Sequence, residues 1–311
     1  MAKQHKLGWL GAGRMGYALA ERLIKAGHDV TVYNRTRTKA EPLAALGAKL
    51  VDSPAALADR DIVFTIVAES DDFVAVTTGP HGVLSRRDAA PRILIDSSTV
   101  SEQASAEVRS AADKRGTALL CAPVSGNPKV VRAGKLSVVV SGPAAAYEEA
   151  RPYLALFGQG VSYVGEGERA RIVKICHNVM LGVVTQALAE ITILAEKSGV
   201  PRHAFLDFMN KSVMGSTFTR YKTPAFVNLD FAATFTPPLL KKDLDLGLAA
   251  ARALGVPLPV AALTREIVQA MIGNGFTQCD FAALLEVEAK GAGLTLQPEN
   301  VAVSDGLEPK S

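Results

Sequence analysis

The stretch KLGWLGAGRMGYALAERLIKA, residues 6–26, decides the fold that we expect for this chain of 311 residues. It starts as a short apolar run and ends with helical periodicity, and a Gly-x-Gly-x-x-Gly turn lies between the two. In this pattern Gly11 permits a tight turn, Gly13 lets a pyrophosphate approach the backbone, and Gly16 lets the helix pack closely on the strand. The full turn consists of Gly11, Ala12, Gly13, Arg14, Met15 and Gly16. We therefore predict a dinucleotide-binding turn, with a glycine turn that binds no ligand as the alternative.

The first half of the chain continues this alternation of strand-like and helical segments. Apolar runs predict further strands at residues 30–33, 48–51, 61–67, 93–95, 118–122, 136–140 and 161–164. Helical patterns cover residues 14–26, 36–46, 54–58, 101–115 and 144–156. Strands that alternate with helices predict a doubly wound, mostly parallel sheet of the Rossmann type.

The second half of the chain shows helical patterns and no convincing strand. One long pattern covers residues 168–198, and shorter ones follow at 201–211, 240–254, 259–274 and 281–290. We therefore predict an α/β fold with a Rossmann-like N-terminal domain over residues 1–165 and an all-helical domain over residues 166–295, joined by a long interdomain helix. The polar residues 296–311 are expected to form a flexible tail.

The composition is typical of a soluble globular protein, with 48% hydrophobic and 21% charged residues. A net charge of +3, spread along the chain, is too small to favour nucleic acid as a partner. The three cysteines and five histidines show no spacing typical of a disulfide framework or a metal site. The apolar stretch at residues 179–194 is broken by polar residues, and no signal core follows the first residues. We therefore expect a cytoplasmic protein with no membrane span and no bound metal.

The residues after the second predicted strand indicate which dinucleotide would bind. An acidic residue there would hold the ribose 2′-hydroxyl of NAD, but this chain has Asn34, Arg35 and Thr36. A guanidinium binds a 2′-phosphate through its charge and paired hydrogen bonds, so Arg35 favours NADP. The alternative is a solvated basic face at the start of a helix, where cations oppose the helix dipole.

Three further motifs carry polar residues that suit ligand chemistry. Residues 96–99, Asp-Ser-Ser-Thr, follow a strand, where they could contact a ligand or cap the next helix, and the residues alone leave both open. Ser125 and Gly126 form a turn that could bind a carboxylate, with an ordinary turn as the alternative. Lys174 and Asn178 share one face of the long helix, where the lysine is snorkelling, ion-paired or catalytic.

Taken together and in order, these motifs resemble those of the β-hydroxyacid dehydrogenase family. The order is Gly-x-Gly-x-x-Gly, Asp-x-Ser-Thr, Ala-Pro-Val-Ser-Gly, Lys-x-x-x-Asn and Lys-Asp-Leu, the last at residues 242–244. The family includes 3-hydroxyisobutyrate dehydrogenase, tartronate semialdehyde reductase and glyoxylate/succinic semialdehyde reductase, with imine reductases and 6-phosphogluconate dehydrogenase as more distant relatives. The resemblance covers about residues 6–292.

The resemblance implies roles for the residues at matching positions. Lys174 matches the catalytic lysine, and Asn178 matches the asparagine that orients the substrate. Ser125 and Gly126 match the turn that binds the substrate carboxylate, and Asn127 stands where many members have a second glycine. Beyond the glycine turn and residues 34–36, the implied cofactor contacts are Val67, Ala68, Ser98, Thr99 and Lys242, with Thr99 also near the substrate.

The resemblance also implies an activity: an NADP-dependent oxidoreductase that reduces a small carboxylated aldehyde to the hydroxyacid, or catalyses the reverse. In that reaction Lys174 would act as general acid or base, which requires a lowered pKa, and burial beside Arg171 is expected to lower it. An imine reductase of the same fold and a non-catalytic NADP-binding sensor are the alternatives. The resemblance further implies a homodimer or homotetramer assembled through the helical domain.

Overall fold

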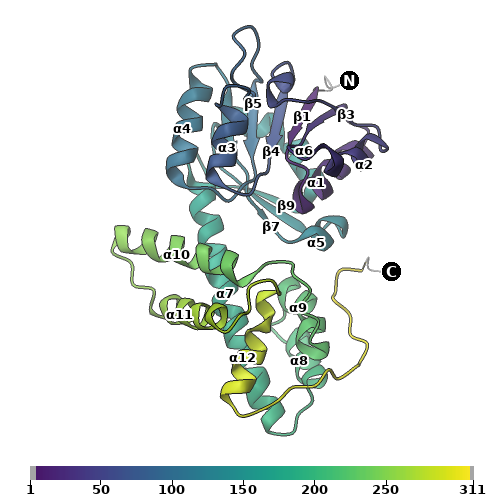
Figure 1. Cartoon of the computed structure of the whole chain (residues 1–311), viewed down its shortest axis with the longest axis vertical. Helices are drawn as coiled ribbons and strands as arrows, with labels where there is room; N and C mark the ends of the chain where they lie inside the picture. Colours follow the sequence, from purple (N-terminus) through teal and green to yellow (C-terminus); the bar gives the residue numbers. More distant parts are fainter. Residues whose placement is uncertain (1–4, 309–311) are drawn as a thin grey trace. The chain divides into compact units, whose positions relative to one another are not determined.

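The computed structural model describes residues 5–308, which form two compact units (Figure 1). The first unit extends to Lys174 and the second begins at Ile175. This division lies inside helix α7 (Arg169–Lys197), so the predicted long interdomain helix begins in the first unit and continues in the second.

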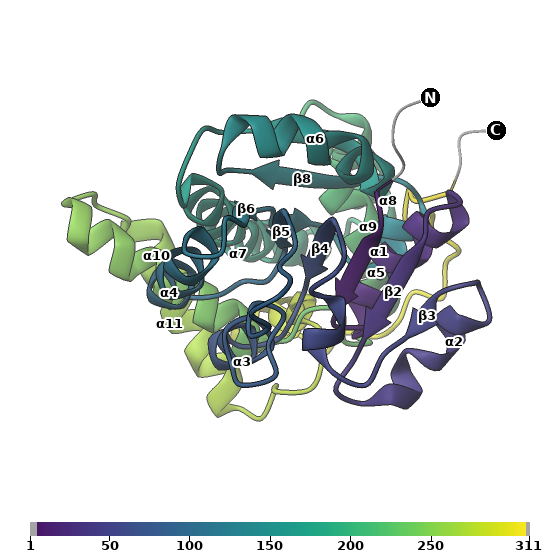
Figure 2. The same ribbon diagram turned by 90° about the horizontal axis from the view of Figure 1, so that it is seen from above.

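The first unit is built on a parallel sheet of six strands in the order β3-β2-β1-β4-β5-β6, which confirms the predicted Rossmann-like fold (Figure 2). Its strands are β1 (Leu7–Leu10), β2 (Val30–Tyr33), β3 (Lys49–Leu50), β4 (Ile62–Thr65), β5 (Ile93–Asp96) and β6 (Ala118–Cys121). Because β1 pairs with both β2 and β4, the order of strand addition reverses at β1. Ligands of open α/β sheets bind beyond the carboxyl ends of the strands at such a point.

A small second sheet extends the first unit. Its order is β7-β8-β9, with β7 (Val124–Ser125) antiparallel to β8 (Leu136–Val140) and β9 (Gly158–Tyr163) parallel to β8. The predicted strands near residues 136–140 and 161–164 therefore exist but lie outside the main sheet. The helices and 3₁₀ turns of the unit are α1 (Arg14–Lys25), η1 (Arg37–Lys39), α2 (Glu41–Ala44), η2 (Pro54–Leu57), α3 (Ser70–Thr77), α4 (Glu102–Asp113), α5 (Pro128–Arg132), α6 (Ala144–Leu154) and η3 (Ala155–Phe157).

Both faces of the six-stranded sheet are buried, as a doubly wound fold requires. Neighbouring residues of a strand point to opposite faces, and both Val63 and Phe64 of β4 are fully buried. Val63 packs in one cluster with Phe73 of α3 and Val108 of α4. Phe64 stacks on Trp9 of β1, with ring centroids 5.4 Å apart. The sheet therefore holds the carboxyl ends of β1, β2, β4 and β5 rigidly side by side.

One predicted helix of the first unit is wrong. Residues 36–46 form the 3₁₀ turn η1 and the short helix α2 instead of one continuous helix. Pro42 lies in the first turn of α2, where its ring cannot follow a preceding helical turn, so a new helix starts there. Helices α3 and α5 lie in segments for which we predicted no helix.

The second unit contains helices and, within its described residues 175–308, no strand, as predicted. After α7 come α8 (Arg202–Lys211), α9 (Thr217–Asn228), α10 (Pro237–Leu254), α11 (Pro259–Gly273), η4 (Phe281–Ala283) and α12 (Leu284–Gly291). The unpredicted helix α9 starts with a capping box between Ser216 and Thr219 and accommodates Pro224. Leu206, Phe226, Leu244, Met271 and Phe281, from five different elements, are buried together in the core of this unit.

The end of the described chain has no regular structure but is fastened to the second unit. The Glu299 carboxylate accepts hydrogen bonds from the amides of Arg202 and His203, at 2.7 and 2.9 Å. Asn228 donates to the carbonyl of Val301 at 2.9 Å. These contacts hold residues that we expected in a flexible tail.

Helix α7 is long and apolar enough to cross a membrane when judged by length and composition alone. Half of its most apolar 18-residue window is buried inside the protein. The buried core helix of a globular domain meets the same criterion, so the helix is weak support for a membrane span.

Candidate functional site

The glycine turn after β1 has the geometry that its sequence predicts. Gly11 has φ +98°, and a Cβ atom there would lie 2.2 Å from the carbonyl oxygen of Ile66. A Cβ atom at Gly16 would lie 2.0 Å from the carbonyl oxygen of Gly11. Gly13, the N-cap of α1, faces open space, because a Cβ atom there would meet nothing within 4 Å. The turn therefore packs tightly at both ends and leaves room for a ligand beside the helix N-terminus.

Asn34, at the carboxyl end of β2, ties the glycine turn to the next loop. Its side-chain oxygen accepts a hydrogen bond from the Ala12 amide at 2.7 Å, and its side-chain nitrogen donates to the Thr36 carbonyl at 2.7 Å. Asn34 thus positions the loop that carries Arg35. The Arg35 side chain is 81% exposed and contacts Asp72 of α3 at 2.7 Å. Its guanidinium is therefore largely exposed and paired with a carboxylate of α3 through one of its nitrogen atoms.

The loops after β4 and β5 are joined through Ser98. Its hydroxyl accepts a hydrogen bond from the Val67 amide at 2.9 Å and donates to the Asp96 carboxylate at 2.7 Å. Ser98 is buried, and its two hydrogen bonds hold together the loops that carry candidate cofactor contacts. Ser101 caps α4 through a hydrogen bond from the Ala104 amide, so the hydroxyl residues 97–99 are not the cap of that helix.

The Ser125-Gly126 turn lies at the end of the short strand β7. Gly126 has φ +138°, and a Cβ atom there would lie 2.7 Å from Val130 Cγ1. Asn127 caps α5, since its side-chain oxygen accepts hydrogen bonds from the amides of Lys129 and Val130 at 2.9 and 3.1 Å. The sequence signal for this cap was present, because Asn-Pro is typical of a helix start. Asn127 thus has a structural task besides any effect on a substrate pocket.

The first turns of α7 carry both Lys174 and a buried charge cluster. Lys174 is partly exposed, whereas Arg171, one turn earlier, is 4% exposed and contacts the carboxylates of Asp96 and Glu168 at 2.9 and 2.8 Å. Burial opposes the charge on Arg171, but Asp96 raises the pKa of this guanidinium. The guanidinium beside Lys174 is therefore paired with two carboxylates.

Glu168 and Cys121 in this cluster have strongly shifted pKa values. Burial alone would raise the pKa of Glu168, but hydrogen bonds from Ser105, Cys121 and Arg109 lower it to about 2. Burial raises the pKa of the Cys121 thiol to about 12. The thiol is therefore protonated and inert at neutral pH.

The shift at Glu168 predicts a loss of stability in acid. A carboxyl with a lowered folded-state pKa stabilises the fold above its ordinary pKa of 4.5, and this contribution of about 3 kcal/mol is lost as pH falls toward 2. Glu168→Gln should therefore flatten the dependence of unfolding free energy on pH over this window in urea titrations. Glu148→Gln, at an exposed position of α6, is the control. Equal slopes for Glu168→Gln and wild type would contradict the prediction.

Asn178, one turn beyond Lys174 on α7, is buried and bound to a residue that we had not predicted. Its side-chain nitrogen donates to the Asp243 carboxylate of α10 at 2.6 Å, and its side-chain oxygen contacts His177 Nδ1 at 2.9 Å. Asp243 is 2% exposed. The sequence signal for this contact was the acidic residue within the Lys-Asp-Leu motif. Its partner Asn178 lies 65 residues away, so residue spacing could not predict the contact.

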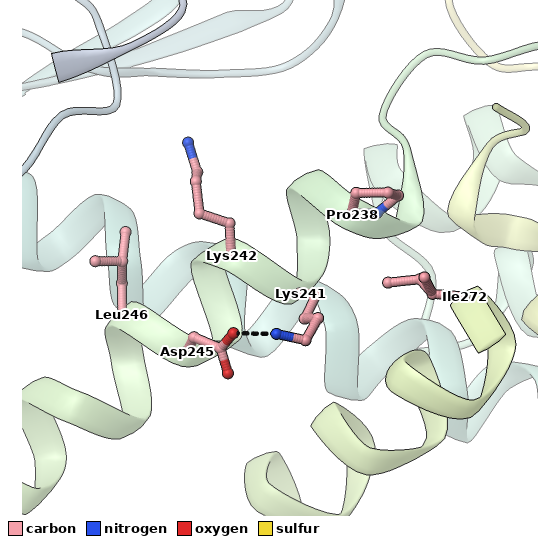
Figure 3. A pocket seen from close by; sticks show the side chains of 6 residues that line it. All are labelled: Pro238, Lys241, Lys242, Asp245, Leu246 and Ile272. Carbon is pink, nitrogen blue, oxygen red and sulfur yellow. Dashed lines mark hydrogen bonds and ion pairs between the residues drawn. The ribbon is translucent and has the colours of Figure 1, made fainter. Parts of the chain in front are cut away.

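Lys242, the adjacent residue of the motif, lines an open groove of about 460 Å³ in the second unit (Figure 3). Lys241 turns to Asp245 and pairs with it at 2.6 Å, whereas Lys242 extends in another direction (Figure 3). The remaining lining residues are Pro238, Leu246 and Ile272. The groove therefore combines an apolar wall with an extended ammonium group.

Two family models match the chain along most of its length. The NAD binding domain of 6-phosphogluconate dehydrogenase matches residues 6–165, and the NAD-binding domain of NADP-dependent 3-hydroxyisobutyrate dehydrogenase matches residues 168–287. The chain belongs to the β-hydroxyacid dehydrogenase family. The resemblance read from the five motifs is confirmed, and this member of the family is an NAD(P)-dependent oxidoreductase.

Individual proteins agree with the β-hydroxyacid dehydrogenase assignment. Glyoxylate/succinic semialdehyde reductase 2, chloroplastic, from Arabidopsis thaliana is 30% identical over 90% of this chain and 78% of its own. The structure of Mycobacterium tuberculosis 3-hydroxyisobutyrate dehydrogenase with L-serine has a TM-score of 0.78 and 29% identity, over 92% of this chain and 99% of its own. An imine reductase from Myxococcus stipitatus in complex with NADP⁺ has a TM-score of 0.58 and 25% identity, over 90% and 99%.

Proposed function

We propose that this β-hydroxyacid dehydrogenase is an NADP-dependent reductase of small carboxylated aldehydes. The observation that carries the proposal is Arg35, an exposed guanidinium at the carboxyl end of β2 where an NAD-selective fold has a carboxylate. The preceding residue, Asn34, is hydrogen-bonded to the glycine turn at Ala12 and to Thr36, so it holds the loop that carries Arg35. NADP preference favours reduction, because cells keep that cofactor pool reduced.

The first unit has the features that a dinucleotide needs. The open space at Gly13 suits a pyrophosphate, Arg35 suits a 2′-phosphate, and the Val67 backbone lies in the loop that would cover the nicotinamide side. Arg14, Met15, Ala68 and Thr99 complete the proposed contacts from this unit, and Lys242 is the proposed contact from α10. When bound, the cofactor supplies the hydride, and the protein positions and polarises the substrate.

Lys174 is the proposed general acid. Hydride addition to an aldehyde carbon leaves a negative oxygen, which the Lys174 ammonium would stabilise and protonate. In the reverse direction the neutral amine would accept the alcohol proton. Asn178, held by Asp243, would orient the reacting oxygen, and the Ser125 hydroxyl with the backbone near Gly126 would hold the substrate carboxylate.

The relatives support an aldehyde that carries a carboxylate. One of them is named as a reductase of glyoxylate and succinic semialdehyde, and another as a 3-hydroxyisobutyrate dehydrogenase with L-serine bound. NADPH oxidation would be measured with succinic semialdehyde, glyoxylate, tartronate semialdehyde, methylmalonate semialdehyde and one cyclic imine, with NADH in parallel. Turnover of a carboxylated aldehyde with NADPH is expected. If no substrate of the panel is turned over while NADPH still binds, a non-catalytic NADP-binding sensor is favoured instead.

An imine reductase is the second candidate, because an enzyme of that activity shares the fold at 25% identity. Protonation of an imine also needs a proton donor, so Lys174 alone does not separate the two reactions. The cyclic imine in the panel does. If the enzyme turns over the imine and none of the carboxylated aldehydes, the second proposal replaces the first.

Arg35 provides the test of cofactor choice. Arg35→Ala should lower kcat/KM for NADPH by about ten- to a hundredfold, because a charge-assisted phosphate contact is lost, and should leave the value for NADH nearly unchanged. Arg86→Ala, which removes an exposed arginine paired with Asp88, is the matched control. Equal losses with both cofactors would show that Arg35 does not read the 2′-phosphate.

We also propose a cytoplasmic homo-oligomer. Large apolar side chains are exposed on the second unit, and they include Met180, Leu194, Leu254, Val260 and Leu263. An association of subunits would cover such side chains. Light scattering would give the number of subunits.

A further inference from the structure

A buried polar cluster in the first unit connects three segments of the chain. These segments carry the loop proposed to contact the cofactor and the residue proposed to be catalytic. Asp96, at the end of β5, is fully buried, and its carboxylate accepts four hydrogen bonds. One carboxylate oxygen binds the Thr65 hydroxyl and the Ser98 hydroxyl and amide, at 2.6, 2.7 and 3.2 Å. The other oxygen binds the Arg171 guanidinium at 2.9 Å. Asp96 thus connects the end of β4, the loop after β5 and the start of α7.

The Arg171 side chain contacts more residues of this cluster than Asp96 alone. Besides Asp96, its guanidinium donates to the Ser98 carbonyl at 3.2 Å, and to Glu168 and the Ser105 hydroxyl at 2.8 Å each. It also lies over the ring of Phe73 in α3, with 5.8 Å between its Cζ atom and the ring centroid. The guanidinium reaches these four acceptors through its three nitrogen atoms, with Nε shared between Glu168 and Ser105. A lysine ammonium cannot supply this planar, forked geometry.

The contacts continue from Arg171 to the proposed cofactor loop. Ser98, which is held by both Asp96 and Arg171, accepts the hydrogen bond of the Val67 amide. Arg171 also lies on the same helix as Lys174, one turn before it. A contact that fixes the position of Arg171 therefore also fixes the rotation of this helix turn, and with it the direction in which Lys174 points. A displacement of Arg171 would therefore reach both the Val67 loop and Lys174.

We propose that Arg171, through Asp96 and Ser98, is a positioning residue that fixes Lys174 and the Val67 loop in one common geometry. This inference rests on the proposed function, in which Lys174 is the general acid and the Val67 loop contacts the cofactor. Small displacements of a reacting group are costly, since about 1 Å can lower a rate a hundredfold. A buried arginine with two carboxylates and no other task would not affect the rate in this way.

The charges of the cluster agree with a rigid unit. The pKa of Arg171 is raised by Asp96 against the effect of burial, and the pKa of Glu168 is lowered by its hydrogen bonds to about 2. Both groups are therefore ionised throughout the pH range of an enzyme assay. The interaction does not open and close with pH, and a mutation is needed to test it.

The test compares Arg171→Lys with Arg202→Lys. Arg202, in the second unit, is a matched arginine: it is 1% exposed, pairs with Glu196 and donates to the carbonyls of Phe226 and Val227. Both variants should lose a similar amount of thermal stability. Only Arg171→Lys should lower kcat, by about ten- to a hundredfold at a temperature where it is folded, while KM for the aldehyde stays within about twofold. Its Kd for NADPH should rise by a few fold.

Hydrogen–deuterium exchange adds a measurement that does not depend on activity. Arg171→Lys should increase exchange at both residues 66–70 and residues 169–174, whereas Arg202→Lys should change neither. Asp96→Asn, which keeps the shape of the side chain and removes its charge, should act in the same direction, and it decides the question where Arg171→Lys does not fold. Exchange and kcat equal to wild type in the folded variants would overturn the proposal, as would an equal loss of kcat in Arg202→Lys.

The two proposals fail in different ways. If exchange increases in Arg171→Lys but Lys174→Ala turns over normally, Arg171 does hold these segments in place, and Lys174 is not the general acid. Unchanged exchange and kcat in Arg171→Lys, combined with a dead Lys174→Ala, would overturn the positioning role alone.

Discussion

Lys174→Ala is expected to lower kcat for NADPH-dependent aldehyde reduction by about 10²–10⁴-fold, the range that a positioned general acid contributes. The variant should fold, because Lys174 is partly exposed and lies outside both hydrophobic cores. Its Kd for NADPH should stay close to that of the wild type. The single tryptophan, Trp9, donates to the Gly11 carbonyl at 2.8 Å, so quenching of its fluorescence reports binding at the glycine turn.

Two further variants make this experiment specific. Lys197→Ala removes another lysine of α7, which donates to the Ala292 carbonyl, and should keep kcat within about twofold of wild type. Lys174→Arg keeps a cation but cannot release its proton near neutral pH, so it should bind substrate and turn over slowly. A Lys174→Ala enzyme with kcat within about tenfold of wild type would remove the lysine from the proposed proton transfer.

The parts of the candidate site that are governed by local backbone geometry could be predicted from the sequence. Gly11 and Gly16 must lack a side chain because a backbone oxygen lies where a Cβ atom would stand, and this need follows from the strand–turn–helix pattern itself. The parallel sheet follows equally from alternating apolar and helical segments. Pro42, in contrast, was a visible helix breaker inside the helix predicted over residues 36–46.

The buried polar contacts could not be predicted in this way. Arg171 and Asp96 are 75 residues apart, and Asn178 and Asp243 are 65 apart, so only the folded chain brings each pair together. The family resemblance implies ligand contacts for these motifs, yet Asn34, Ser98 and Asn127 also bind the protein's own backbone. Side chains of this kind organise the loops on which a ligand site depends, and their pattern does not distinguish the two tasks.

Asp280→Ala should destabilise the second unit more than any other substitution of a single charge that we propose. Asp280 is 2% exposed and pairs with the ammonium group of Lys222, which is 4% exposed. Its carboxylate also accepts hydrogen bonds from the amides of Thr234, Phe235 and Ala282, at 3.2, 3.2 and 2.9 Å. Removal of the carboxylate leaves a buried ammonium and three amides unpaired, so the expected loss is about 3–5 kcal/mol.

The electrostatics of this pair decide the sign of its pH dependence. Burial would raise the pKa of Asp280, but Lys222 and the hydrogen bonds lower it below its ordinary value. The carboxylate therefore stabilises the fold above its ordinary pKa, and this contribution is lost as pH falls below that value. Wild type should lose this part of its stability in acid, and Asp280→Ala should not.

A double-mutant cycle separates the ion pair from the space that it fills. Lys222 lies over the ring of Phe281, with its Nζ atom 4.3 Å from the ring centroid, so an apolar side chain can occupy its place. Lys222→Met combined with Asp280→Ala should therefore be less destabilised than Asp280→Ala alone, because no charge is left buried without a partner. Asp207→Ala, which removes an exposed carboxylate paired with Lys211, should lower the stability by less than about 1 kcal/mol. Urea unfolding followed by circular dichroism measures the four proteins of the cycle, which include Lys222→Met alone, and the Asp207→Ala control. Strictly additive losses in the cycle would show that the buried charges act independently.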